Sequence, residues 1–93
     1  MENKIQKYII ITPSGLRLTF RHESDGLYYT LNPKTMLCFA FNATGLLLFY
    51  MALQGYAASE IQIELNRIGL KIEPFCAIVE FIDFLYREEF LDG

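Results

Sequence analysis

The sequence contains no tryptophan, one histidine and only two cysteines among its 93 residues. The histidine, His22, and the cysteines, Cys38 and Cys76, cannot supply a zinc site at any normal ligand spacing. Two cysteines are also too few for a disulfide-stabilised scaffold, so we interpret both as small buried hydrophobic residues. The sequence therefore predicts no metal site and no oxidising compartment.

Long hydrophobic runs are also lacking. The longest covers residues 46–53, whereas a membrane-spanning helix needs about 18 or more apolar residues. Glu2 precedes the first lysines, and the apolar stretch at residues 8–11 is too short for a signal peptide. A hydrophobic content of 53% with 20% charged residues excludes intrinsic disorder. We expect a cytoplasmic protein that has no membrane partner.

Positive charge is scarce in the C-terminal part of the chain. Residues 1–34 carry five basic and three acidic side chains, whereas residues 35–93 carry three basic and eight acidic ones. The net charges are +2 and −5, and they sum to the −3 of the whole chain. This distribution favours a basic partner for the second part and argues against nucleic acid.

A change of periodicity organises the chain, which we interpret as a single domain over residues 1–93. The segment 1–12 comes first, residues 13–41 have the alternation of β-strands, and residues 42–92 have helical spacing. We expect strands at residues 16–21, 27–31 and 36–41, separated by turns at Ser24-Asp25-Gly26 and Asn32-Pro33. Tyr8 to Thr12 is a candidate for a further short strand.

Three helices are predicted after the strands. Asn42 or Thr44 can cap the first, which should end before Gly55. The pattern Ser59-Glu60-Ile61-Gln62 resembles a capping box for the second, whose inner face would be Ile61, Leu65 and Ile68. The third should begin at Pro74 and end near Phe90. The sequence thus predicts an α+β domain of winged-helix type, with a three-stranded antiparallel sheet followed by three helices.

The third helix carries more apolar surface than one small core needs. At 100° per residue its expected core face is made of Phe75, Ile78, Val79, Ile82, Leu85 and Tyr86. A second flank holds Ala77, Phe81 and Phe84, with Glu88 beside them. This flank is either an exposed interaction patch or is covered by the first helix or the N-terminal segment.

The third predicted strand, residues 36–41, is apolar at every position. Leu37, Phe39 and Phe41 would point to one face and the intervening residues to the other. At a sheet edge this strand would have no charge or proline to prevent pairing with another strand. It is therefore either covered or a docking edge.

No pattern of residues indicates catalysis. The chain has no glycine-rich phosphate loop, nucleophile elbow or Cys-His arrangement. Glu80 and Asp83 could form a carboxylate pair, but a solvated helix face explains them better, and His22 lies in a polar turn. We expect a protein that is not an enzyme and uses no cofactor.

The order of five short motifs resembles the PqqD-like family of peptide chaperones, also called precursor-peptide recognition elements. The motifs are Gly15-Leu16-Arg17-Leu18, Gly26-Leu27-Tyr28-Tyr29-Thr30-Leu31-Asn32-Pro33, Phe41-Asn42-Ala43-Thr44-Gly45, Leu53-Gln54-Gly55, and Glu60-Ile61 with Leu65. The segment Phe81-Ile82-Asp83-Phe84-Leu85 and the pair Phe90-Leu91 are similar to the family's closing helix. The resemblance covers about residues 13–92.

The resemblance implies a function that composition does not show. Members of the family bind the leader of a ribosomally made precursor peptide and present it to a modifying enzyme, such as a radical SAM enzyme, a cyclase or a leader protease. The leader adds a strand to the third strand and lies against the third helix. By resemblance, the leader-binding residues here would be Met36, Leu37, Cys38, Phe39, Ala40, Phe41, Ala77, Ile78, Phe81, Phe84 and Glu88.

Two alternatives remain open at this point. A winged-helix nucleic-acid binder would need a basic recognition helix, but the third helix has Arg87 against Glu80, Asp83, Glu88 and Glu89. A dimerisation module could instead pair residues 36–41 with a second copy across a two-fold axis. A homodimer is compatible with peptide binding if the edge opens on demand.

Overall fold

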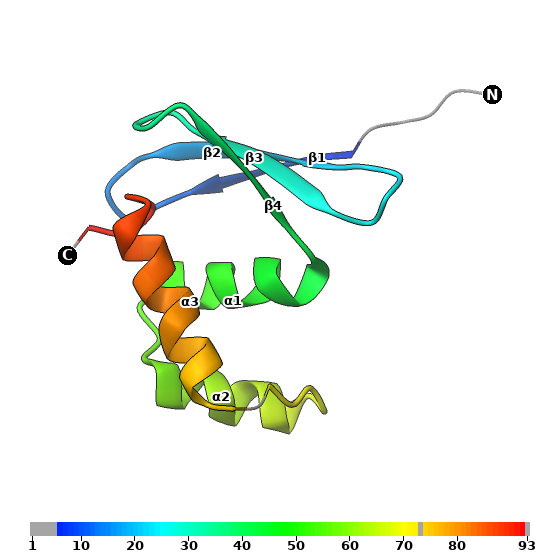
Figure 1. The fold of residues 1–93 in the computed structure, drawn as a ribbon, viewed down its shortest axis with the longest axis vertical. Coiled ribbons are helices and arrows are strands. Elements are labelled where there is room, and N and C mark those ends of the chain that lie inside the picture. The colour runs from blue at the N-terminus through cyan, green and yellow to red at the C-terminus, as the bar shows by residue number, and fades with distance from the viewer. Residues whose placement is uncertain (1–5, 73, 93) are drawn as a thin grey trace. The chain divides into compact units, whose positions relative to one another are not determined.

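The computed structural model describes residues 6–72 and 74–92. It is a small α+β fold in which an antiparallel sheet precedes three helices (Figure 1). The chain forms two compact units, residues 1–46 and 47–93, and the division falls inside the first helix. The predicted order of strands first and helices second is confirmed.

The described sheet has four strands rather than the three predicted ones, because the candidate N-terminal strand is the fourth member. They are β1 (Gln6–Ile11), β2 (Arg17–His22), β3 (Tyr28–Asn32) and β4 (Leu37–Phe41). They lie in chain order within the sheet, and every neighbouring pair is antiparallel. The candidate short strand, Tyr8 to Thr12, is present but displaced by one to two residues, since β1 pairs with β2 from Gln6 opposite His22 to Ile11 opposite Arg17. This pairing makes it a full member of the meander.

One face of the sheet is buried, as the alternation in β2 predicts. Leu18 and Phe20 are fully buried, whereas Arg17, Thr19 and Arg21 between them are exposed. The register places the buried residues of the other strands on the same face, and these are Thr30, Asn32 and Phe41. The Thr30 hydroxyl donates a hydrogen bond of 2.9 Å to the Thr19 carbonyl, which removes the penalty for burying it.

The turn between β3 and β4 sets where the last strand begins. The Asn32 side chain accepts a hydrogen bond from the Lys34 amide (2.9 Å), and the Asn32 carbonyl accepts one from the Met36 amide (2.7 Å). Met36 has a φ of 62°, in the left-handed region, which is incompatible with a strand. The strand therefore begins at Leu37, and the predicted first strand residue, Met36, belongs to the turn.

The helices are α1 (Ala43–Leu53), α2 (Ala58–Arg67) and α3 (Cys76–Arg87). Asn42 is the cap of α1, because its side chain accepts a hydrogen bond of 2.7 Å from the Gly45 amide. The predicted capping box at Ser59 is wrong, since Ser59 lies inside α2 and Ala57 occupies the N-cap. Glu60 accepts a hydrogen bond of 2.9 Å from the Ala57 amide, which is one half of such a box.

The end of α3 lies three residues before the predicted one. Glu89 adopts a left-handed φ of 62°, and the Phe90 amide turns back to the Leu85 carbonyl at 2.9 Å. This is the Schellman pattern of helix termination. It directs Phe90 to the interior, where its ring meets that of Phe49 edge-on at 5.1 Å.

The helical unit has its own hydrophobic core, built from Leu48, Met51, Ile61, Leu65 and Ile78. Ile68, which the sequence places on the inner stripe of α2, is 51% exposed. The reason is that α2 ends at Arg67, so Ile68 is the C-cap with φ −92° and ψ 6° and departs from the helical stripe. None of the helices in the described ranges is long and apolar enough to span a bilayer.

We expect Ile61→Ala to lower the free energy of unfolding by about 2–5 kcal/mol, because Ile61 is fully buried in this core. Ile63 on the same helix is the matched control. It is 64% exposed, so Ile63→Ala should change stability by no more than about 0.5 kcal/mol. Urea unfolding followed by circular dichroism measures both. Equal losses in the two variants would contradict this burial of α2.

The turn between β2 and β3 gives a pH-dependent contribution to stability. Hydrogen bonds donated by the Tyr29 hydroxyl and by the Leu27 amide (2.9 Å) lower the pKa of Asp25. A carboxyl group whose pKa is lower in the folded state stabilises the fold above its unfolded pKa. It loses this contribution as the pH falls through the folded pKa, below about pH 4.

Tyr29→Phe should therefore raise the pKa of Asp25 toward its ordinary value, because it removes the hydrogen bond that lowers this pKa most. The stability of the variant should depend less steeply on pH below about pH 4. Titration of the Asp25 carboxyl by NMR measures the shift directly, with Tyr28→Phe as the control. An unchanged pKa in Tyr29→Phe would refute the assigned hydrogen bond.

Candidate functional site

Strand β4 forms one edge of the sheet. Within the described residues β3 is the only strand paired with it, from Asn32 opposite Leu37 to Tyr28 opposite Phe41. β4 contains neither a charged residue nor a proline, which are the usual devices that protect an edge. The outer side of β4 is therefore suited to accept hydrogen bonds from, and donate them to, another extended backbone.

The side chains of β4 alternate as predicted. Phe41 is buried and Phe39 half-buried on the face that also carries Phe20 and Thr30. Cys38 and Ala40 lie on the opposite face and are exposed. Both are small, so they leave room for the side chains of a neighbouring strand. Leu37 shares the inner face but is 51% exposed at the end of the strand.

The residues predicted on α3 do not form one exposed patch. Ile78 is 1% exposed and belongs to the helical core, so its side chain cannot line an open site. Phe81 packs against the same core. Ala77, Phe84 and Glu88 are half-buried. Phe81 is half-buried as well, but it packs against the core, so we take Phe84 as the candidate anchor for a ligand.

Phe84 lies in a small aromatic and charged cluster on α3. Its ring centroid is 6.0 Å from that of Phe81, and the Arg87 guanidinium carbon lies 5.9 Å from the Phe84 centroid. Arg87 also lies 3.7 Å from a Glu88 carboxylate oxygen. The Arg87 guanidinium thus lies between the Phe84 ring and the Glu88 carboxylate.

The predicted core face of α3 is partly wrong. Ile78 and Leu85 are buried, but Phe75, Val79 and Tyr86 are 40%, 37% and 45% exposed. The helix is turned so that Phe81 faces the core instead of Val79 and Tyr86. A phenylalanine ring buries more apolar area than valine, and a tyrosine hydroxyl needs water or a hydrogen-bond partner, so this orientation is the more favourable one.

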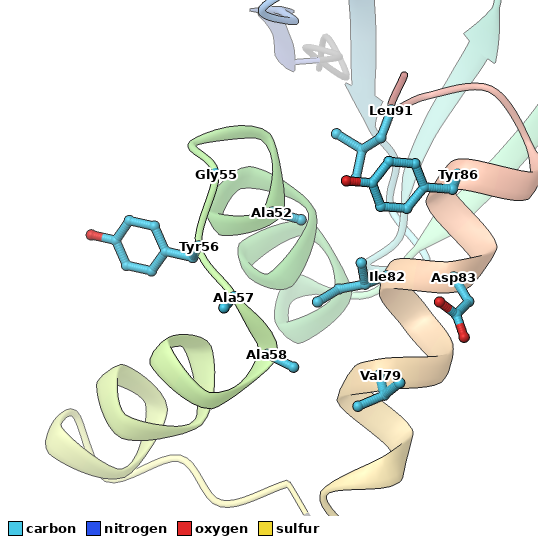
Figure 2. Close-up of a pocket in the computed structure, with 10 residues that line it drawn as sticks. All are labelled: Ala52, Gly55, Tyr56, Ala57, Ala58, Val79, Ile82, Asp83, Tyr86 and Leu91. Atoms are coloured by element: carbon cyan, nitrogen blue, oxygen red, sulfur yellow. The ribbon is translucent and has the colours of Figure 1, made fainter. Parts of the chain in front are cut away.

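The turned helix leaves a groove that sequence reasoning missed. The groove has a volume of about 310 Å³ and lies between α3 and the connection from α1 to α2 (Figure 2). Its lining residues are Ala52, Gly55, Tyr56, Ala57, Ala58, Val79, Ile82, Asp83, Tyr86 and Leu91. Figure 2 shows Ile82 pointing from α3 toward the opposite wall, whereas the Tyr56 ring points away from α3. No sequence motif marks this groove, because it depends on the rotation of α3.

Charge at the groove comes from Asp83, the only carboxylate among the described residues that line it. Glu80 lies almost one turn earlier on α3 and is also exposed. Neither carboxylate forms a salt bridge with any of the residues in the ranges 6–72 and 74–92. The site is therefore apolar with an unpaired negative charge at its side.

The described part of the chain holds no group of three or more His, Cys, Asp or Glu side chains able to hold a metal ion. His22 stacks on Tyr28, with 4.2 Å between the ring centroids and 5° between the ring planes. The predicted burial of the cysteines is wrong, since Cys38 and Cys76 are both exposed free thiols. Cys38 is exposed because it occupies the outer face of an edge strand, and Cys76 because it begins α3 on the side away from the core.

No family model, curated protein or solved structure matches this chain. The resemblance to the PqqD-like family consequently remains a prediction from the motifs in the sequence.

Both thiols should react with Ellman's reagent in the native protein without prior unfolding, because both cysteines are exposed. We expect two thiols per chain to react at rates near that of a small-molecule thiol. The control is the same reaction in 6 M guanidinium chloride, which should give the same number of thiols. A thiol that reacts only after unfolding would contradict the exposure of β4 or of the start of α3.

Proposed function

We propose that the protein binds the leader region of a ribosomally synthesised precursor peptide by strand addition at β4. The observation that carries the proposal is the position of β4 at an edge of the sheet, with no charge and no proline along it. An extended peptide on this edge would satisfy backbone groups of both chains. The motifs that resemble the PqqD-like family support the same function from the sequence.

The edge by itself selects poorly among peptides, because backbone hydrogen bonds are common to every sequence. Selectivity has to come from side-chain contacts. Phe39 is half-buried on β4, and Ala77, Phe84 and Glu88 are half-buried on α3. From the family resemblance, we propose that Phe39 in the first unit and Phe84 in the second each contact an apolar leader side chain. Aromatic anchors offset the entropy lost when a disordered peptide becomes ordered.

The remainder of the proposal follows from the family resemblance. We propose a single winged-helix-like domain that acts in the cytoplasm as a peptide chaperone. It presents its bound precursor to a modifying enzyme, such as a radical SAM enzyme, a cyclase or a leader protease, and is not itself an enzyme. An extended leader held at a sheet edge would leave its core segment free for such an enzyme.

Binding of nucleic acid is less well supported. The exposed side chains of α3 include Glu80 and Asp83, and Arg87 is the only basic residue on this helix. The net negative charge of the helix repels phosphates. Pairing of β4 with a second copy uses the same edge as peptide binding. A homodimer and the peptide complex would therefore compete for β4.

The test is a titration with the leader of the short peptide encoded beside the gene, labelled with fluorescein and followed by anisotropy. We expect a dissociation constant of about 1 μM or lower, near −8 kcal/mol. Two further leaders carry backbone N-methyl groups on every second residue, in complementary frames. One is methylated at the odd-numbered residues and the other at the even-numbered ones, so each blocks the amides that the other leaves free. In an added strand only one set of amides faces β4, so one frame should abolish binding and the other should retain it.

The two N-methylated leaders keep every side chain, and each is the control for the other. Equal binding by both would overturn strand addition, and no binding of the unmodified leader up to about 100 μM would overturn the assigned partner. Phe84→Ala should weaken binding about tenfold by removing an anchor. Sedimentation velocity on the free protein then shows whether a homodimer forms, and loss of that dimer on addition of the leader would indicate that both use β4.

A further inference from the structure

The groove between α3 and the α1–α2 connection has the properties of a side-chain pocket. We propose that it binds a bulky apolar side chain of a peptide ligand that carries lysine or arginine at the next position. The inference rests on the proposed function in taking the ligand to be a peptide. It concerns a surface other than β4 and residues that the family resemblance does not assign.

The walls of the groove are small on one side and apolar on the other. Gly55, Ala57 and Ala58 form the first wall, and Val79 and Ile82 contribute to the second. The absence of large side chains from the first wall is what leaves about 310 Å³ open. A leucine or phenylalanine side chain placed there would lose part of its contact with water, and this loss favours binding.

The first wall is held in place by hydrogen bonds. Gly55 has a φ of 89°, and its amide donates to the Ala52 carbonyl at 3.0 Å while the Tyr56 amide donates to the Met51 carbonyl at 3.2 Å. The Ala57 amide is bound by the Glu60 carboxylate at 2.9 Å. Three consecutive amides are thus fixed, so little conformational entropy is lost when a ligand enters.

The negative charge at the groove favours a basic residue next to the apolar side chain that enters it, which we call the anchor. Asp83 lines the groove, is exposed and forms no salt bridge with the described residues. Glu80 on the same helix adds to the negative potential, and residues 35–93 carry a net charge of −5. A cation next to the anchor would meet unpaired carboxylates, whereas an acidic residue there would be repelled.

The experiment uses dipeptides that are too short to add a strand. Acetyl-Phe-Arg-amide carries the anchor and the cation, acetyl-Phe-citrulline-amide removes only the charge, and acetyl-Ala-Arg-amide removes only the anchor. Binding to the full chain is followed by amide chemical shifts in NMR. We expect the first dipeptide to shift the amides of residues 55–58 and 79–86 with a dissociation constant of about 1 mM. Citrulline should weaken binding about two- to fivefold, and alanine about tenfold or more.

Protein variants assign the effect to the groove. Asp83→Asn should remove the preference for arginine over citrulline, while Glu89→Gln, an exposed carboxylate outside the groove, should leave it unchanged. Ala57→Phe should abolish binding by filling the groove. Ala57 is exposed with extended backbone angles, so the larger residue is compatible with the fold.

The outcomes separate this inference from the proposed function. No shift of the groove amides at 20 mM dipeptide, or equal affinity for arginine and citrulline, overturns the inference. If the leader binds with the frame dependence of an added strand while Asp83→Asn and Ala57→Phe leave its affinity unchanged, strand addition stands and the groove proposal is wrong. If the dipeptide binds in the groove but neither N-methylated frame affects the leader, the groove proposal stands and strand addition is wrong.

Discussion

The structure depends on left-handed backbone at the ends of its regular elements. A residue of positive φ occurs in each turn of the sheet and after each of the three helices, and these residues are Gly15, Gly26, Met36, Gly55, Gly69 and Glu89. Each reverses the chain within a few residues, which is what lets a short sequence build four strands and three helices. Four of the positions are glycine, for which this conformation carries no steric penalty. Met36 and Glu89 adopt it against the usual preference of residues with a side chain.

The left-handed conformations of Met36 and Glu89 affect the candidate surfaces. The left-handed Met36 closes the β3–β4 turn and leaves β4 with five apolar residues as the exposed edge. The left-handed Glu89 ends α3 and directs Phe90 onto Phe49, which anchors the C-terminal end of α3 in the helical unit. In the α1–α2 connection, Gly55 shapes the small-residue wall of the groove. The turns therefore fix where the edge begins and shape one wall of the groove, while the orientation of α3 supplies the other wall.

The two candidate surfaces differ in the kind of recognition they offer. The β4 edge offers backbone groups and is indifferent to most of a ligand's sequence, whereas the groove offers apolar volume and the carboxylate of Asp83. A peptide-binding protein needs both properties, because affinity from the backbone has to be combined with discrimination by side chains. The acidic charge of the helical part also disfavours nucleic acid as a competing ligand.

The sequence by itself determined the features that depend on neighbours along the chain. The alternation in β2, the turn at Asn32-Pro33 and the helix end at Gly55 are all local, and each was predicted from a few adjacent residues. The cap of α1 was narrowed to Asn42 or Thr44, and the structure has Asn42. The rotation of α3 and the exposure of both cysteines were decided only by tertiary structure. α3 is apolar on two flanks, and periodicity cannot say which flank the rest of the protein will cover. In the folded protein Phe81 packs against the core, and the same orientation of α3 exposes Val79 and Tyr86 and leaves the groove open.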